Sequence, residues 1–261
     1  MKKARVLLTA PNLLVNEGEL SRIEPPMGLL LFAPLLQQDG HEVLIKDFAL
    51  EGWDTLTPFD LKNKRYIRGA TEEYMAKVIS DFNPDILGIS VLYSSLIDSA
   101  KTVAKIAKKI NPKITVIVGG NCISNSVVDY KFYLADKQNS GLPDYITHFE
   151  GEDFDYAMTG EAEYPFKDFV NAIINGKDVR NIPGLIIRTT PANPDNIINQ
   201  LLRGTFCSKK RMAPNATNIG IVCMIAEEIA REPKTMLITN NTEEKSSQKK
   251  RMTNGKLFNS V

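Results

Sequence analysis

The sequence predicts an α/β fold, in which a mostly parallel sheet is covered by helices on both faces. Two observations carry this prediction. Segments typical of strands and of helices alternate through the first 190 residues, and the strand segments are mostly apolar, as strands covered on both faces are. Such alternation favours crossover connections between parallel strands. A chain of 261 residues is long enough to bury the core of this fold.

The first strand is predicted over residues 5–9, an apolar run that stops just before Pro11. A helix is predicted over residues 28–38, and we expect a bend at Pro34 because proline removes a backbone donor. A glycine turn then leads into the second strand, residues 41–46.

The middle of the domain repeats this pattern. A helix is predicted over residues 71–82, where apolar side chains recur on one face. The third strand, residues 86–92, is nearly all apolar, and the amphipathic helix over 97–110 carries lysines on its outer face. The fourth strand, residues 114–118, ends at Gly119-Gly120.

A short strand over residues 156–158, a helix over 161–174 and a last strand over 184–188 end the series, while residues 122–150 show no clear pattern. The arrangement is that of a flavodoxin-like (Rossmann-like), doubly wound parallel five-stranded sheet, whose usual strand order is 2-1-3-4-5. Its ligand crevice lies at the carboxyl ends of strands 1 and 3, where the strand order reverses.

Residues 1–190 are therefore predicted to form one α/β domain. Residues 191–261 are more basic and end in a polar stretch with few apolar anchors. One helix is predicted there, over residues 219–231, and we expect the rest of this tail to be poorly ordered.

The composition excludes several classes of function. The 32 Lys+Arg nearly balance the 31 Asp+Glu, and a net charge of +1 offers no footprint for nucleic acid or an anionic membrane. No apolar run approaches the ~20 residues that span a bilayer, and no signal-peptide cleavage site follows the N-terminal lysines. We expect a cytoplasmic protein whose partners include neither nucleic acid nor a membrane.

Cysteine and histidine are scarce. Cys122, Cys207 and Cys223 are too widely spaced for a disulfide framework, a zinc ribbon or an iron–sulfur cluster of the usual spacing. With only His41 and His148, a multi-histidine metal centre is excluded too. His41 precedes the second strand, at the end of the sheet far from the crevice, and is interpreted as a turn residue.

Three features fall where this topology places a ligand. A long loop, Pro11 to Met27, follows the first strand; small and hydroxylated residues, Ser90 to Ser95, follow the third; Gly119-Gly120-Asn121 follows the fourth. Glycines there could let a ligand approach the backbone closely. Each feature also has a structural interpretation, since Ser90 could cap a helix and the glycines could form a tight turn. Taken jointly, they favour a binding site.

Two nucleotide-binding motifs are missing. No Gly-x-Gly-x-x-Gly follows the first strand, and no Walker-type Gly-x-x-x-x-Gly-Lys-Ser/Thr loop is present. The pattern therefore does not favour a nicotinamide, flavin or nucleoside triphosphate as the ligand.

An ordered set of motifs covers roughly residues 4–190. It consists of Pro25-Pro26-Met27-Gly28-Leu29-Leu30, Gly40-His41-Glu42-Val43 with Asp47, Ser90-x-Leu92, Gly119-Gly120, Asp155 to Glu163, and Ile182 to Arg188. This set resembles the cobalamin-binding domain of radical S-adenosylmethionine enzymes.

The resemblance implies cobalamin as the cofactor, with its nucleotide tail beside the sheet and the corrin ring over the strand ends. The residues that it implies for cofactor binding are Pro11, Asn12, Met27, Gly28, Ser90, Leu92, Tyr93, Ser94, Gly119, Gly120, Asn121, Gly160 and Glu161. Glu161 and Glu163 have a second interpretation, because carboxylates at a helix start interact favourably with the helix dipole.

The sequence departs from classical cobalamin domains, whose Asp-x-His-x-x-Gly motif supplies a histidine below the cobalt. Aligning Gly28 with that glycine puts Ile23 and Pro25 at the Asp and His positions, so we expect no lower-axial histidine. The similar spacing of Asp47-x-Ala49-x-x-Gly52 follows the wrong strand and is interpreted as coincidence.

The catalytic half of such an enzyme has no counterpart here. Whole enzymes of this type continue into a barrel whose Cys-x-x-x-Cys-x-x-Cys motif holds an iron–sulfur cluster, and this chain has no such motif. The resemblance thus implies a methyltransferase-like binding module that holds no cluster, no metal ligand and no catalytic residue of its own. Its expected partner is a radical S-adenosylmethionine catalytic domain or protein, whether the chain is a fragment or a stand-alone binder.

Two alternative functions fit the fold class. A flavodoxin-like signalling or receiver domain would need carboxylates after the first strand, and residues 9–13 contain none. A small nucleotide-sugar-binding α/β enzyme could use the same crevice for a diphosphate, although no Asp-x-Asp metal site follows a strand.

Overall fold

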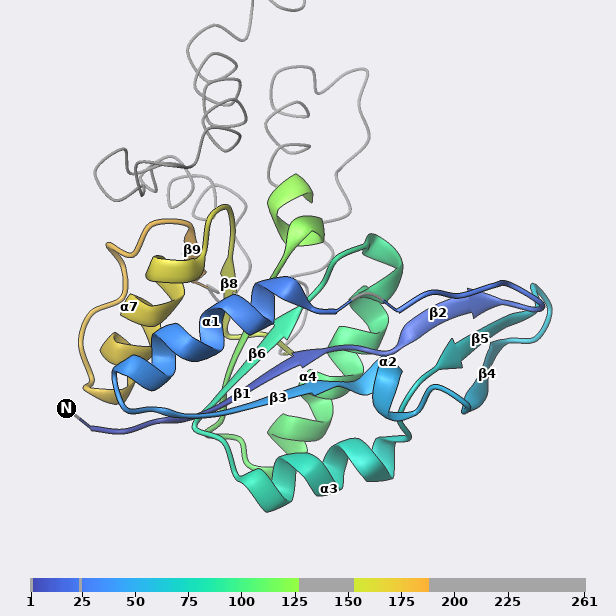
Figure 1. The fold of residues 1–261 in the computed structure, drawn as a ribbon, viewed down its shortest axis with the longest axis horizontal. Coiled ribbons are helices and arrows are strands. Elements are labelled where there is room, and N and C mark those ends of the chain that lie inside the picture. The colour runs from blue at the N-terminus through green and yellow to red at the C-terminus, as the bar shows by residue number, and fades with distance from the viewer. Residues whose placement is uncertain (1, 24, 127–152, 188–261) are drawn as a thin grey trace, which may run out of the picture. The chain divides into compact units, whose positions relative to one another are not determined.

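The computed structural model describes residues 2–23, 25–126 and 153–187. Its centre is a six-stranded sheet in the order β3-β1-β6-β7-β8-β9, drawn in Figure 1. The strands are β1 (Arg5–Ala10), β3 (Glu42–Asp47), β6 (Ile86–Ser90), β7 (Thr115–Gly119), β8 (Tyr156–Met158) and β9 (Leu185–Ile187).

The first five strands of this sheet are parallel and have the predicted order, so the doubly wound plan is confirmed. One difference is the number of strands, because the sheet has six rather than five. The sixth, β9, pairs with β8 in the antiparallel direction. Helix α7 ends near the amino edge, and residues 175–184 lead back to the carboxyl edge, where the carbonyl of Gly184 accepts a hydrogen bond from the N–H of Thr159. β9 starts from that edge and therefore runs opposite to β8.

Helices cover both faces of the sheet. α1 (Met27–Gln38) and α7 (Glu163–Ile174) pack on one face, while α3 (Glu72–Phe82) and α4 (Ile97–Ile110) pack on the other. The strands supply both layers because their side chains alternate. In β1, Leu7 faces α3 and α4, whereas Val6 and Leu8 face α1 and α7.

The helices begin and end where the sequence supplies the right residues. The hydroxyl of Thr71 accepts a hydrogen bond from the backbone N–H of Tyr74 at the start of α3, and Asn83 takes the left-handed conformation that ends it. The predicted helix over 161–174 begins two residues later, at Glu163.

A second sheet was not predicted. β2 (Leu13–Asn16), β5 (Arg65–Arg68) and β4 (Leu56–Asp60) form three antiparallel strands in that order, which extend beyond the central sheet in Figure 1. The predicted long loop after the first strand therefore contains a strand, and the short helix α2 (Phe48–Glu51) follows β3. We call β2, β4 and β5 the small sheet.

Several predictions fall outside the described residues: the domain limit at residue 190, the tail with its helix over 219–231, the end of the last strand at Arg188, and the positions of His148, Cys207 and Cys223. In the part of the chain that is described, no helix is long and apolar enough to cross a membrane.

Candidate functional site

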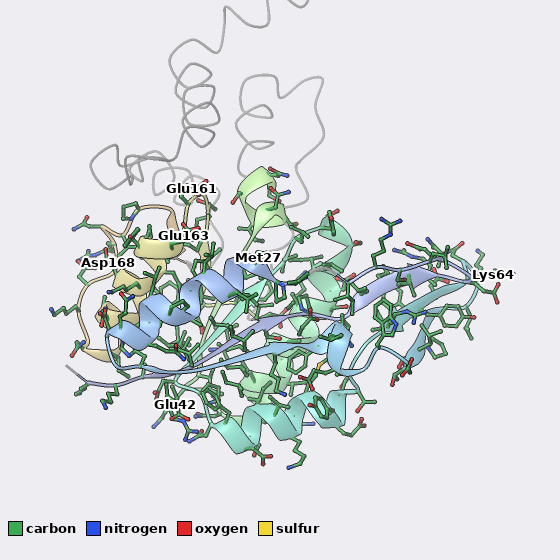
Figure 2. The ribbon with its side chains drawn as sticks, viewed as in Figure 1. Met27, Glu42, Lys64, Glu161, Glu163 and Asp168 are labelled. Carbon is green, nitrogen blue, oxygen red and sulfur yellow. The ribbon has the colours of Figure 1, made fainter. Side chains whose placement is uncertain are left out.

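All of the sequence-predicted site residues lie at the carboxyl edge of the parallel strands, where the topology expects a ligand. They follow β1 (Pro11, Asn12), open α1 (Met27, Gly28), end or follow β6 (Ser90, Leu92, Tyr93, Ser94), end or follow β7 (Gly119, Gly120, Asn121) and follow β8 (Gly160, Glu161). Figure 2 shows Met27, Glu161 and Glu163 on this side of the sheet, and Glu42 at the opposite edge.

The loops after β6 and β7 are joined by backbone hydrogen bonds. The N–H of Val91 donates to the carbonyl of Gly119 at 2.8 Å, and the N–H of Cys122 donates to the carbonyl of Val91 at 3.1 Å. Gly120 has φ +104°, and a Cβ there would lie 2.6 Å from the carbonyl oxygen of Val91. Glycine is therefore required at 120 by the neighbouring loop, which supports the turn interpretation of this residue.

Exposed apolar side chains stand at the start of α1 and in the loop after β6. Met27 at the start of α1 is 61% exposed, and Leu92 and Tyr93 after β6 are 45% and 60% exposed. At Gly28 nothing lies within 4 Å of where a Cβ would stand, so the start of α1 is open. A large, partly apolar ligand fits this edge, because binding would remove these side chains from water.

The two predicted residues after β1 are buried instead. Asn12 is 5% exposed, and its Nδ2 donates to the carbonyl of Ala70 at 2.8 Å. Its Oδ1 has no hydrogen-bond partner and lies against Gly69, where a Cβ would meet it at 2.1 Å. Asn12 therefore connects the end of β1 to the segment that precedes α3.

A hydrogen bond fixes the loop after β8. The backbone N–H of Gly160, which has φ +73°, donates to Oγ of Ser124 at 3.0 Å. Ser124 lies one turn into the helical segment that begins at Asn121, and its own N–H donates to the carbonyl of Gly120. Sequence reasoning missed Ser124. The sequence did hold a clue to Ser124, because a residue four positions after Gly120 stands one helical turn beyond the strand end and on the same side.

Glu161 has an unusual environment in this loop. The protein atoms around its carboxyl group raise its pKa above the ordinary value, and the charge of Glu163 raises it further. Glu163 lies in the first turn of α7, where a carboxylate interacts favourably with the helix dipole; the N-cap of this helix is Ala162, which makes no side-chain hydrogen bond.

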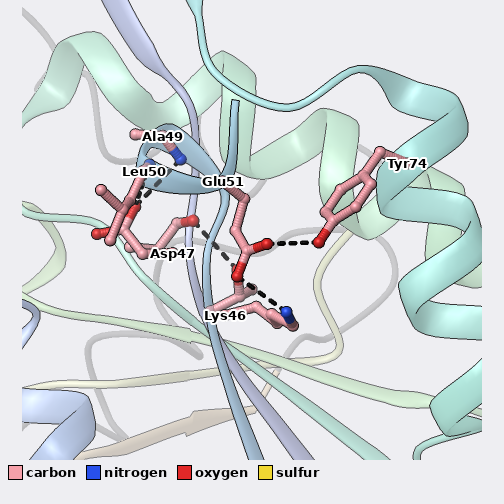
Figure 3. A network of polar contacts seen from close by, with 8 residues as sticks. Lys46, Asp47, Ala49, Leu50, Glu51 and Tyr74 are labelled. Atoms are coloured by element: carbon pink, nitrogen blue, oxygen red, sulfur yellow. Dashed lines mark hydrogen bonds and ion pairs between the residues drawn. The ribbon is translucent and has the colours of Figure 1, made fainter. Parts of the chain in front are cut away.

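The end of β3 is closed by its own polar contacts (Figure 3). Lys46 donates to Glu51 at 2.8 Å, and the hydroxyl of Tyr74 donates to the other oxygen of the same carboxylate. The carboxylate of Asp47 caps α2 by accepting from the N–H groups of Ala49 and Leu50, although burial raises its pKa.

Gly52 completes this corner. A Cβ on Gly52 would lie 2.2 Å from the backbone of Gly69, so glycine is needed there for packing. Asp47 and Gly52 thus have structural roles, in agreement with the interpretation of their spacing as coincidence.

His41 lies at the amino edge, as the sequence predicted, just after the turn at Asp39-Gly40, and it is buried. The N–H of Ala4 donates to its Nδ1 at 3.0 Å, so that nitrogen carries no proton. Nε2 must then hold the proton, and it donates to Oδ1 of Asn171 at 3.2 Å. Among the described residues, no group of three or more His, Cys, Asp or Glu side chains is placed to hold a metal ion.

The family model of the B12 binding domain matches residues 15–151, more than half of the chain. The chain therefore belongs to the B12-binding domain family, whose ligand is cobalamin. This agrees with a doubly wound α/β fold that has an open, partly apolar carboxyl edge.

Two curated relatives are methyltransferases. An uncharacterized methyltransferase of Pyrococcus horikoshii is 30% identical over 204 residues, which are 74% of this chain and 36% of the relative. The cytidylyl-2-hydroxyethylphosphonate methyltransferase of Streptomyces wedmorensis is 31% identical over 116 residues, 44% of this chain and 22% of the relative. The chain thus spans about a third or less of the length of each.

Among solved structures, the radical S-adenosylmethionine methyltransferase TsrM from Kitasatospora setae, with cobalamin and a 4Fe-4S cluster bound, is 18% identical with a TM-score of 0.47. The match covers 73% of this chain and 28% of that one.

Proposed function

We propose that this chain is the cobalamin-binding module of a radical S-adenosylmethionine methyltransferase. Membership of the B12-binding family supports the cofactor, and two methyltransferase relatives support the type of reaction. The ordered motifs between Pro25 and Arg188 support the radical branch. The structural observation that carries the proposal is the exposure of apolar side chains at the carboxyl edge, at the start of α1 and in the loop after β6.

The proposed roles differ between the loops. Met27, Leu92 and Tyr93 offer apolar surface to the corrin ring and the benzimidazole, while Gly28 leaves room for close approach. Ser90, Ser94 and Asn121 offer polar groups to the amide side chains and the phosphate. Gly119 and Gly120 shape the channel, Gly119 through its hydrogen bond from the N–H of Val91 and Gly120 through its close packing on Val91. Gly160 and Glu161 border it, in the loop that the hydrogen bond between Gly160 and Ser124 fixes. When bound, cobalamin supplies a cobalt centre that can carry a methyl group.

We also propose that no histidine of the protein ligates the cobalt from below. His41 is buried at the opposite edge, with both ring nitrogens engaged. The electron paramagnetic resonance spectrum of cob(II)alamin bound to the full chain tests this. Replacing ¹⁴N by ¹⁵N in the histidines should leave the spectrum unchanged, and an altered nitrogen splitting would contradict the proposal.

The iron–sulfur cluster is proposed to belong to a separate domain or protein, which would be the catalytic partner in the cytoplasm. Anaerobic treatment of the full chain with iron and sulfide should give no stoichiometric 4Fe-4S signal by Mössbauer spectroscopy. A stoichiometric cluster would show that the chain holds its own.

A binding experiment with matched leucine variants tests the central proposal. The full chain should retain hydroxocobalamin after desalting, with its corrin absorbance. Leu92→Asp should weaken binding at least tenfold, because it places a charge against the apolar part of the ligand. Leu61→Asp is the control, since Leu61 is also an exposed leucine but lies in the turn between β4 and β5. No retained corrin, or equal losses in both variants, would contradict the proposal.

Neither alternative function gains support. The residues after β1 are Pro11 and Asn12 rather than the carboxylates of a receiver, and the matched family is neither a receiver nor a nucleotide-sugar enzyme.

A further inference from the structure

The two faces of the central sheet are covered unequally at its carboxyl edge. On the face of α3 and α4 the strands are buried to their ends, since Ile89 in β6 is 2% exposed and Val118 in β7 is 0% exposed. On the face of α1 and α7 the last residues of β1, β6 and β7 are all partly exposed. These three residues are Ala10, Ser90 and Gly119, and we call them the strand-end row.

The members of the strand-end row are neighbours in the sheet. Ser90 pairs with Gly119, and Ala10 directly follows Thr9, whose partner Ile89 directly precedes Ser90. They share one face because side chains alternate along a strand. The row therefore offers a methyl group, one hydroxyl and bare backbone, which is a low and mostly apolar surface on which a flat group can lie.

Two aromatic rings close the inner side of the row. Gly88 stands one step further in on the same face, and a Cβ there would lie 3.4 Å from Cζ of Phe166 and 3.0 Å from Cδ2 of Leu8. Phe166 comes from the first turn of α7, and its ring centroid is 5.1 Å from that of Phe32 in α1. We call Phe32 and Phe166 the phenylalanine pair. A flat group on the row would thus meet apolar side chains at its inner edge.

This inference rests on the proposed function and deepens it. We propose that the strand-end row carries the lower base of the cofactor's nucleotide tail, and that the phenylalanine pair selects a benzimidazole over a purine. The outer edge of dimethylbenzimidazole is a hydrocarbon ring with two methyl groups, which suits apolar neighbours. Adenine has ring nitrogens and an amine on the corresponding edge. The row offers one hydroxyl, on Ser90, and the phenylalanine pair offers no polar group. Several polar atoms of adenine would therefore lose water without gaining a partner.

Three corrinoids test the selectivity on the full chain. Cobalamin, adeninyl cobamide and cobinamide share the corrin ring, and their lower base is dimethylbenzimidazole, adenine or absent. Calorimetric titration should show that cobalamin binds about tenfold or more tightly than adeninyl cobamide, because unpaired polar groups are rejected by an apolar site. Cobinamide should also bind more weakly than cobalamin.

The outcomes separate this inference from the proposed function. Equal affinities for cobalamin and adeninyl cobamide would overturn the selectivity, and equal affinities for cobalamin and cobinamide would overturn the contact between base and row. In both cases the chain still binds a corrin, so the proposed function stands. Failure to bind any of the three corrinoids would overturn the proposed function together with this inference.

A substitution in the phenylalanine pair tests its role directly. Phe32 is partly exposed, and Phe32→Asn places an amide where adenine lacks a partner. The ratio of the affinities for cobalamin and adeninyl cobamide should fall by about threefold or more. Phe59→Asn is the matched control, since Phe59 is an exposed phenylalanine in β4 of the small sheet, and it should keep the wild-type ratio.

Circular dichroism checks that both variants fold. If Phe32→Asn does not, Phe32→Tyr keeps the ring, adds a hydroxyl and should lower the ratio in the same direction. An unchanged ratio in the folded Phe32 variant, or an equal change in Phe59→Asn, would overturn the role of the phenylalanine pair.

Discussion

The two edges of the central sheet are built in different ways. At the amino edge a chain of hydrogen bonds runs from the N–H of Ala4 through His41 and Asn171 to the carboxylate of Asp39, which also pairs with Lys167 at 2.8 Å. This series of hydrogen bonds connects α1 and α7 to the starts of β1 and β3.

At the carboxyl edge the hydrogen bonds serve the loops, and apolar side chains such as Leu92 and Tyr93 remain in water. At the amino edge these groups satisfy one another's hydrogen bonds, whereas the carboxyl edge leaves apolar area that a ligand or partner can cover. The difference leads us to expect that binding depends mainly on the carboxyl ends of these strands, while the hydrogen-bond chain at their amino ends serves stability. The following substitutions test how strictly they are separated.

The largest effect on stability is expected at Gly120, where a residue of the proposed binding site is also needed for packing. This glycine belongs to the proposed site, yet Gly120→Ala would place a Cβ 2.6 Å from the carbonyl of Val91 at a positive φ. We expect the free energy of unfolding to fall by about 3 kcal/mol. Urea denaturation measures it. Gly28→Ala is the control, because space is open there and stability should not fall; equal stability of both variants would contradict the packing argument.

At the amino edge, His41→Ala should destabilise the fold by about 2 kcal/mol, because the buried N–H of Ala4 loses its acceptor. Thermal and urea unfolding measure the loss, and cobalamin affinity should not change. The matching change at the other edge, Leu92→Ala, should leave stability within about 0.5 kcal/mol and weaken cobalamin binding. If His41→Ala weakened binding as much as Leu92→Ala did, the two edges would not be separate.

Ser124→Ala should have a smaller effect on stability, about 1 kcal/mol, since it removes one hydrogen bond, to the N–H of Gly160. The loop that carries Glu161 should then be freer, so cobalamin should bind more weakly. Ser124→Thr keeps the hydroxyl and serves as the rescue variant. Calorimetric titration with hydroxocobalamin compares the three proteins, and unchanged affinity in Ser124→Ala would exclude a positioning role.

The smallest effects are expected in the pH dependence of stability. One carboxyl group at each edge contributes, and the two contributions are lost in opposite directions of pH. Hydrogen bonds from Lys167 and then Asn171 lower the pKa of Asp39, so its contribution to stability is present above its ordinary pKa and is lost as the pH falls through the lowered value. The pKa of Glu161 is raised by partial burial, so its contribution is present below the ordinary pKa and is lost as the pH rises through the raised value.

Stability curves between pH 3 and 7 should separate these contributions. Asp39→Asn should reduce the loss of stability on acidification, and Glu161→Gln should reduce the loss on passing from pH 4 upward. If both variants altered the pH dependence of the free energy of unfolding in the same direction, the opposite pKa shifts of Asp39 and Glu161 would be contradicted.

The central sheet could be predicted because each of its main strands is marked by a local pattern of apolar residues. The β6 and β7 segments are nearly pure apolar runs, and β1 stops before a proline. The small sheet could not be predicted in this way. β4 contains Pro58 and is mostly exposed, and β5 is a four-residue strand with an arginine at each end. β4 and β5 form a hairpin, but β2 joins it only by pairing with the distant β5, which a local pattern does not record.

The candidate site was predicted to the level of the strand ends and no further. The topology placed residues such as Ser90 and Gly119 at one edge because parallel strands end together. It could not show that Asn12 is buried against Gly69, or that Gly120 is shaped by Val91, since both contacts depend on how separate loops meet. The assignment of these residues to cofactor binding remains a prediction.

The small sheet also bears on the kinetics of folding. β2 leaves the end of β1, and its partner β5 lies beyond β3 and α2, so that Leu13 pairs with Arg68 across a long loop of chain. Closing such a loop is slow until the segments between are fixed. The β4–β5 hairpin is joined by a short turn and can form early, so we expect only the pairing of β2 with β5 to come late, after β1 and β3 have paired. The hydrogen bond from Asn12 to the carbonyl of Ala70 is then also a late product of folding.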